Sequence, residues 1–364
     1  MRIDSWLLAL VLASPLAAVA SSEAAGARCR ADLDDIAAFL PLNDAGAAEA
    51  RAQHGKQIDA ALERAQADSI RLQDAASDSA CNDILAAYLR AWRPGHLSVS
   101  AVAPNAAPPA AAVPDPRLPR LESLGADTLL LTIPSFNDRY RAPLETLLTR
   151  RRAELEAHRY WIVDVRGNGG GSDTTYAALL PWLLDGDFRQ HALEYLATPV
   201  NIQAQEQICA HQSDPAPCLR QMTPALAAMR AASAGSFVTS ADERSKLERP
   251  THLEPKAPRR VAVLVDRACG SSCDQFALTV KAGFRVKLAG QASAGVVDVG
   301  NLRPHTLPSG RVLRYATTRS TRVTELPLDG IGVQPDLLLP APADDAAREA
   351  DVLRVQRWLE SGRL

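Results

Sequence analysis

Four short, almost purely apolar segments, separated by helical stretches, limit the folds open to this chain more than any other feature. The helical stretches are Leu144–Leu155, Thr174–Leu184 and Gln275–Lys281. Strands that alternate with helices and are nearly continuous in apolar character are typical of a parallel sheet. The sequence therefore predicts an α/β fold around a mostly parallel sheet, whose strands are Thr128–Ile133, Tyr160–Val165, Arg260–Asp266 and Val286–Ala289.

The stretches outside this alternation predict the rest of the organisation. Residues 21–100 carry apolar residues at helical spacing and indicate an N-terminal helical cap. Residues 101–119 are rich in Ala and Pro, which is typical of a stiff, extended linker. We expect the core domain at 120–345, interrupted by an inserted lobe at 190–258, and a C-terminal helix at 346–364.

The first 20 residues have the layout of a secretory signal peptide. Arg2 lies before the apolar run Leu7–Leu12, and Ala18-Val19-Ala20 forms a small-x-small cleavage site. The alternative is an uncleaved apolar N-terminus. The run is too short to span a bilayer, and no later segment reaches about 18 apolar residues. We therefore expect cleavage after Ala20, no membrane span, and a periplasmic or secreted protein.

Composition excludes some classes of partner. Lys and Arg number 40 against 42 Asp and Glu, and the formal net charge is −2. Because there is no basic excess, nucleic acid is not expected as a partner. Aromatic residues make up only 5% of the chain, which argues against a stacking platform for single strands.

Six cysteines become informative once export is expected. An even number in an oxidising compartment favours disulfides, although six cysteines allow 15 pairings. A zinc site is the alternative, but CxxC pairs are missing and no His lies near the last two cysteines. The cysteines fall into sequence-local couples that bracket the N-terminal region, a short loop and a five-residue segment: Cys29 and Cys81, Cys209 and Cys218, Cys269 and Cys273.

Two strand-to-helix turns carry the chemistry that the sequence offers. Arg166-Gly-Asn-Gly-Gly-Gly171 follows the second strand, and its glycines would let backbone N–H groups face an anion. A purely structural turn is one alternative, and a dinucleotide site would need Gly where Ser172 stands. The third strand leads into Ala268-Cys-Gly-Ser-Ser-Cys-Asp-Gln-Phe276, where a serine is either a nucleophile or a helix cap.

Four motifs in order resemble peptidase family S41, which includes C-terminal processing proteases, tricorn protease and the interphotoreceptor retinoid-binding protein. They are Leu130–Phe136, Ile162–Gly171, Val263–Asp274 and Gly332-Val-Gln-Pro-Asp336. The resemblance covers roughly residues 120–340. It implies a ClpP/crotonase-like core, with Ser271 as nucleophile and an oxyanion hole formed by Ser272, Gly169 and its neighbour Gly170.

Two departures place the resemblance in one branch of the family. Processing proteases use a Ser–Lys dyad, but Val296 occupies the lysine position. They also carry a PDZ module, for which the linker leaves no room. In the tricorn-like branch the base is a histidine from the N-terminal part, which implies His96 in Gly95-His96. The acid of that branch falls on Asp329, with Glu325 as its alternative.

The resemblance implies an exported serine endopeptidase that acts on peptide or protein substrates without a cofactor or metal. The first alternative is a non-catalytic binding protein on the same scaffold, because the family includes a retinoid carrier. The second is a hydrolase of ester or cell-wall amide bonds, which would use the same groups. Substrate preference and oligomeric state are not encoded in any motif of the chain.

Overall fold

The computed structural model describes residues 15–72, 77–100, 116–210, 215–239, 246–248 and 252–363. Its residues group into two compact units. One contains 1–93, 97–106 and 304–315, and the other contains 94–96, 107–303 and 316–364. Residues 1–14 of the expected signal peptide and 101–115 of the expected linker lie outside the described residues. No helix in the described ranges has the length and hydropathy that a bilayer crossing requires.

The larger unit is built on a six-stranded sheet with the order β13-β10-β9-β4-β3-β2. All pairs from β13 to β3 are parallel, and β2 pairs antiparallel with β3 at one edge. The four strands expected from their apolar runs are therefore confirmed as neighbours in a parallel sheet. Their bounds are β3 Thr128–Thr132, β4 Tyr160–Asp164, β9 Arg260–Val265 and β10 Val286–Gly290, with β2 at Arg120–Leu124 and β13 at Leu337–Leu338.

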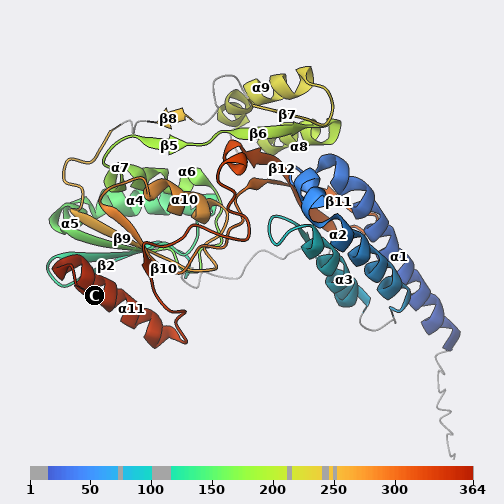
Figure 1. The fold of residues 1–364 in the computed structure, drawn as a ribbon, viewed down its shortest axis with the longest axis horizontal. Coiled ribbons are helices and arrows are strands. Elements are labelled where there is room, and N and C mark those ends of the chain that lie inside the picture. The colour runs from blue at the N-terminus through green and yellow to red at the C-terminus, as the bar shows by residue number, and fades with distance from the viewer. Residues whose placement is uncertain are drawn as a thin grey trace, which may run out of the picture. The chain divides into compact units, whose positions relative to one another are not determined.

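Helices cover both faces of this sheet (Figure 1). Along β4, Trp161 and Val163 enter the core on one face, whereas Tyr160 and Ile162 enter the core on the other. This alternation follows from the two-residue period of a strand. Among the described helices, the second face packs against α11, Asp345–Ser361. The first face is covered by α4 Arg141–Arg150, α5 Arg152–Ala157, α6 Asp173–Tyr176, α7 Leu180–Leu183 and α10 Ser272–Val280.

The region expected as an inserted lobe also has secondary structure. The strands β5, Phe188–Gln190, and β8, Lys246–Glu248, pair with each other outside the main sheet. The strands β6, Leu193–Ala197, and β7, Ser236–Val238, pair with each other, and β6 also pairs with residues 318–320 of β12, Val312–Ser320. Between β6 and β7 lie α8, Pro199–Ala210, and α9, Pro215–Ala231. The Cys209–Cys218 disulfide joins these two helices.

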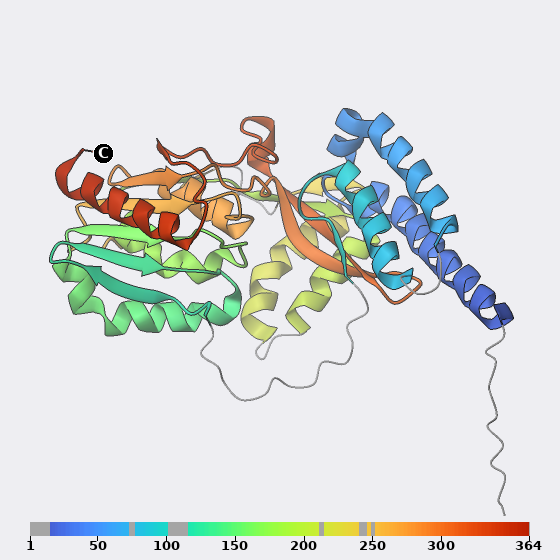
Figure 2. The same ribbon diagram turned by 90° about the horizontal axis from the view of Figure 1, so that it is seen from below.

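The smaller unit is a helical assembly of α1, Pro15–Asn43, α2, Ala47–Ile70, and α3, Ser77–Trp92. The Cys29–Cys81 disulfide joins α1 to α3 inside its apolar core (Figure 2 shows the three helices). The short strand β1, Ser98–Ser100, pairs with residues 312–314 of β12. The strand β11, Val299–Thr306, pairs with β12, and neither strand was expected from the sequence.

Candidate active site

Ser271 lies on a sharp turn between β9 and α10 and has an unusual backbone conformation. Its φ is 57° and its ψ is −120°, whereas an ordinary N-cap residue has extended backbone angles. Such a conformation costs on the order of 1–3 kcal/mol for a residue with a side chain. Ser271 is also the N-cap residue of α10 and forms a capping box with Asp274, so the helix-cap role expected as the alternative is present together with this strain.

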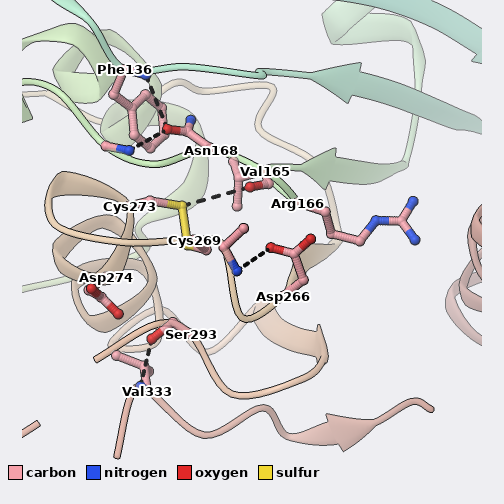
Figure 3. The surroundings of a disulfide bond; sticks show 12 residues. Phe136, Val165, Arg166, Asn168, Asp266, Cys269, Cys273, Asp274, Ser293 and Val333 are labelled. Atoms are coloured by element: carbon pink, nitrogen blue, oxygen red, sulfur yellow. Dashed lines mark hydrogen bonds between the residues drawn. A yellow bond between two sulfur atoms is a disulfide. The ribbon is translucent and has the colours of Figure 1, made fainter. Parts of the chain in front are cut away.

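A disulfide and a buried carboxylate hold the Ser271 turn in place. Cys269 and Cys273 are fully buried and form the disulfide expected for this couple (Figure 3). The carboxylate of Asp274 is fully buried and accepts from the backbone N–H of Ser271 at 2.8 Å. It also accepts from the N–H of Gly295 at 2.9 Å and of Val296 at 3.1 Å. The strained serine is therefore fixed on both sides.

The glycine turn after β4 is organised by one side chain, Asn168. This amide is fully buried, and its Oδ1 accepts from the N–H of Gly170 at 2.9 Å and of Phe136 at 3.2 Å. Its Nδ2 donates to the Ile133 carbonyl at 3.0 Å. Figure 3 shows Asn168 between Phe136 and the disulfide. Asn168 thus ties the turn to the segment that follows β3.

The two turns touch each other at Gly170. A Cβ built on Gly170 would lie 2.5 Å from the Gly270 carbonyl oxygen, 2.9 Å from Cβ of Ser271 and 3.0 Å from the N of Ser272. The N–H of Gly270 donates to the Asn168 carbonyl at 3.1 Å. Because Gly170 also has a φ of 96°, only glycine fits here without strain or displacement.

Each of the two touching turns also carries a backbone N–H group that has no acceptor among the described residues. Within the described part of the chain, neither the Gly169 N–H nor the Ser272 N–H has an intramolecular acceptor. The N–H of Gly170 is occupied by Asn168. The arrangement therefore offers Gly169 and Ser272 as donors to a bound anion or oxyanion, and gives Gly170 a packing role.

His96 shares the left-handed backbone of Ser271 and lies in the same unit. Only His96, Ser271 and Asn301 have positive φ among the non-glycine residues that the structure describes. Nδ1 of His96 is hydrogen-bonded to the carbonyl oxygen of Val299. Because a carbonyl only accepts, the proton belongs to Nδ1, and Nε2 of the neutral ring keeps its lone pair.

Val296 connects the histidine segment to the serine turn. A Cβ built on Gly95 would lie 2.1 Å from Cγ1 of Val296, and one built on Gly270 would lie 3.1 Å from its Cγ2. Gly95 precedes His96, and Gly270 precedes Ser271. The residue at the family's lysine position is therefore an apolar spacer that brings the backbones of the histidine and serine segments together.

Asp329 hydrogen-bonds the two residues before Val299, whose carbonyl accepts from His96. Its Oδ1 accepts from the N–H of Val297 at 2.7 Å and of Asp298 at 2.8 Å. The alternative acid, Glu325, has a side chain that is 67% exposed and lies 3.6 Å from Arg189. Asp329 therefore contacts the segment that leads to Val299, whereas the Glu325 side chain is exposed.

Other features lie apart from this arrangement or were missed by sequence reasoning. Lys281 donates to the Gln334 carbonyl at 2.6 Å. A cavity of about 850 Å³ opens near the starts of β9 and β10, and its lining contains neither serine nor histidine. Sequence reasoning missed the structural role of Asn168 and the Val299 carbonyl. The only available signal for Asn168 was its place within a glycine cluster.

The comparisons with known proteins agree with the fold. The profile of peptidase family S41 matches residues 127–339. Mature CPAF is similar at 14% identity and a TM-score of 0.58, over 92% of this chain and 96% of that chain. A lipoprotein from Streptococcus agalactiae is similar at 17% identity and a TM-score of 0.50, over 99% of both chains. No curated protein sequence matches.

Proposed function

Because the chain belongs to peptidase family S41, we propose that it is an exported serine endopeptidase that uses Ser271, His96 and Asp329. The observation that carries this proposal is the contact between the strained Ser271 turn and the glycine turn. Ser271 precedes the open N–H of Ser272 and touches the glycine turn at Gly170, whose neighbour Gly169 carries the other open N–H. A nucleophile next to paired backbone donors is the arrangement that acyl transfer needs.

The proposed reaction begins with proton transfer from Ser271. Nε2 of His96 takes the hydroxyl proton while Oγ attacks the scissile carbonyl carbon. The carbonyl oxygen becomes an oxyanion, which the N–H groups of Gly169 and Ser272 stabilise by several kcal/mol. The C–N bond then breaks, and the imidazolium gives its proton to the leaving amine.

Water completes the cycle. His96 removes a proton from water, the resulting hydroxide attacks the acyl ester, and a second oxyanion forms in the same place. Collapse of this intermediate releases the new carboxyl end, and the imidazolium returns the proton to Oγ of Ser271. The Val299 carbonyl keeps Nδ1 protonated throughout, which holds the ring in the tautomer that acts as a base.

Asp329 supports the histidine through the backbone in this scheme. Its carboxylate accepts from the N–H groups of Val297 and Asp298 and so fixes this segment. The next residue, Val299, supplies the carbonyl that accepts from His96. Val296 supports the same assignment, because an apolar side chain at the lysine position cannot take a proton. Histidine is therefore the proposed base.

A non-catalytic binding protein is the competing function. A carrier would gain nothing from a serine at φ 57°, because this backbone conformation costs stability. Export is supported by the three disulfides, which pair all six cysteines. Disulfides of this kind persist in oxidising compartments.

Peptide-bond hydrolysis tests the proposal directly. The purified chain, incubated with a mixture of peptides from denatured proteins, should generate new N-termini that mass spectrometry detects. Ser271→Ala should generate none above background. If the wild-type protein cleaved ester substrates but no peptide, the endopeptidase assignment would be replaced by the esterase alternative. If it cleaved neither, the binding-protein function would be favoured.

A further inference from the structure

The carboxylate of Asp266 receives one hydrogen bond from each of the two turns. Asp266 directly follows β9, and its Oδ1 accepts from the N–H of Gly167 at 2.9 Å and of Ala268 at 3.0 Å. Gly167 belongs to the glycine turn, and Ala268 begins the serine turn. One side chain, drawn in Figure 3, therefore links the backbones of both turns.

This link is separate from the contact at Gly170. In sequence, Gly167 lies three residues before Gly170, and Ala268 lies three residues before Ser271. The two turns are therefore joined at two points, which fix both the spacing between them and the angle at which they meet. The open N–H groups, one on each turn, can stabilise one oxyanion together only when that spacing is right.

Arg348 of the C-terminal helix α11 is bonded to the same pair of turns. Its Nη2 donates to the Arg166 carbonyl at 2.9 Å, and its Nη1 lies 3.6 Å from Oδ2 of Asp266. Arg166, the first residue of the glycine turn, donates in return from its Nη1 to the Arg348 carbonyl at 3.2 Å. The helix α11 is thus attached to the glycine turn directly and to the serine turn through Asp266.

The two oxygens of the Asp266 carboxylate have different partners. Oδ1 bonds the two turns, whereas Oδ2 faces the guanidinium of Arg348. The side chains of this pair are 19% exposed for Asp266 and 34% exposed for Arg348. Because a pair with this much solvent contact contributes little to overall stability, its main effect is to orient the carboxylate toward the turns.

We propose that Asp266 and Arg348 are positioning residues for the oxyanion site. Asp266 sets the spacing of the two turns, and Arg348 keeps the carboxylate in the orientation that does so. This inference rests on the proposed function, since the turns present the donors for that reaction. Because a displacement of about 1 Å costs about a hundredfold in rate, we expect Asp266→Ala to lower kcat roughly ten- to a hundredfold and to leave KM nearly unchanged.

The experiment measures kcat and KM, per mole of folded protein, for Asp266→Ala, Asp266→Asn, Arg348→Met and the double variant Asp266→Asn with Arg348→Met. Each of the two conservative changes breaks the ion pair but keeps an oxygen for both turns, so we expect losses in kcat of roughly three- to tenfold. The double variant should lose no more than Arg348→Met alone, because both changes break the same pair.

The matched control is Arg354→Met, which should retain the wild-type kcat. Arg354 is exposed on the same helix α11, and it has no ion-pair partner within the described ranges. Thermal unfolding of all variants shows whether a loss of activity only follows a loss of folded protein. If Asp266→Ala does not fold, the two single variants and their double variant decide the question.

Labelling with a fluorophosphonate separates this inference from the proposed function. If Ser271 is labelled and peptides are cleaved, but Asp266→Ala retains its kcat, the positioning role is wrong while the peptidase assignment stands. Losses that multiply in the double variant, or a change confined to KM, would also overturn the positioning role. If Ser271 is not labelled and no peptide is cleaved by folded wild-type protein, both proposals fail.

Discussion

The turns after β4 and β9 leave neighbouring strands of one sheet, yet different means hold them in shape. The β4 turn is rich in glycine and depends on one buried amide, Asn168. The β9 turn carries a strained serine and is fixed by a disulfide and the Asp274 carboxylate. The comparison indicates a division of labour, in which one turn presents N–H donors and the other presents a side chain.

The largest expected loss of activity follows from removing His96, the proposed base that activates Ser271. His96→Ala removes the proposed base, so kcat should fall on the order of 10³-fold or more, comparable with Ser271→Ala. Initial rates on a cleaved peptide measure this. Lys287→Ala is the control, because Lys287 is exposed and should be replaced with little loss. A dead lysine variant beside a nearly normal His96→Ala would contradict the histidine assignment.

Gly170→Ala should break the contact between the two turns. The added methyl would lie 2.5 Å from the Gly270 carbonyl, so the turns must separate, and we expect kcat to fall about a hundredfold. The matched control is Gly167→Ala, where φ is also positive, 80°, but no atom lies within 4 Å. Equal losses in the two variants would show that backbone strain alone, not the contact, matters.

Removing disulfides should separate activity from stability. Cys269→Ala with Cys273→Ala releases the serine turn, whereas Cys209→Ala with Cys218→Ala releases α8 from α9. The chain-entropy relation gives about 2 and about 3 kcal/mol for these short loops, so the two losses of stability should be similar. Only the first pair should lower kcat, by roughly tenfold. Unfolding curves and rates on the same preparations would decide this, and equal activities would contradict it.

The smallest expected effect concerns the stability of the folded state and Asp173, the first residue of α6. A carboxyl whose pKa is raised by burial destabilises the folded state when it is ionised. This cost is absent below the ordinary Asp pKa and appears as pH rises through the raised value. Asp173→Asn should therefore increase Tm at pH 8 but leave it nearly unchanged at pH 3.5. A decrease at pH 8 would mean that the ionised carboxylate stabilises the fold.

The parallel sheet could be predicted from the sequence, whereas the β11–β12 hairpin could not. The predicted strands are buried on both faces and therefore consist of apolar residues, as β9 shows. The hairpin carries Arg303 and Arg311, which resemble surface residues in the sequence. Both are buried because Arg303 bonds Gln205 and Arg311 pairs with Asp32. Such compensation depends on distant residues that no local pattern reveals.

Some residues of the candidate site could likewise be predicted from the sequence, whereas others could not. Ser271 and the glycine turn could be predicted because each directly follows a strand of the sheet, where sites form. The Val299 carbonyl that holds His96 lies on a strand that the sequence did not indicate.

The most direct test of the account is to identify the residue that a fluorophosphonate modifies. The central claim is that the contact between the two turns makes Ser271 a nucleophile. Peptide mapping of the labelled wild-type protein should place the modification on Ser271, with Ser271→Ala unlabelled and His96→Ala labelled at least about a hundredfold more slowly. Modification of another serine, or none at all in folded wild-type protein, would contradict the claim.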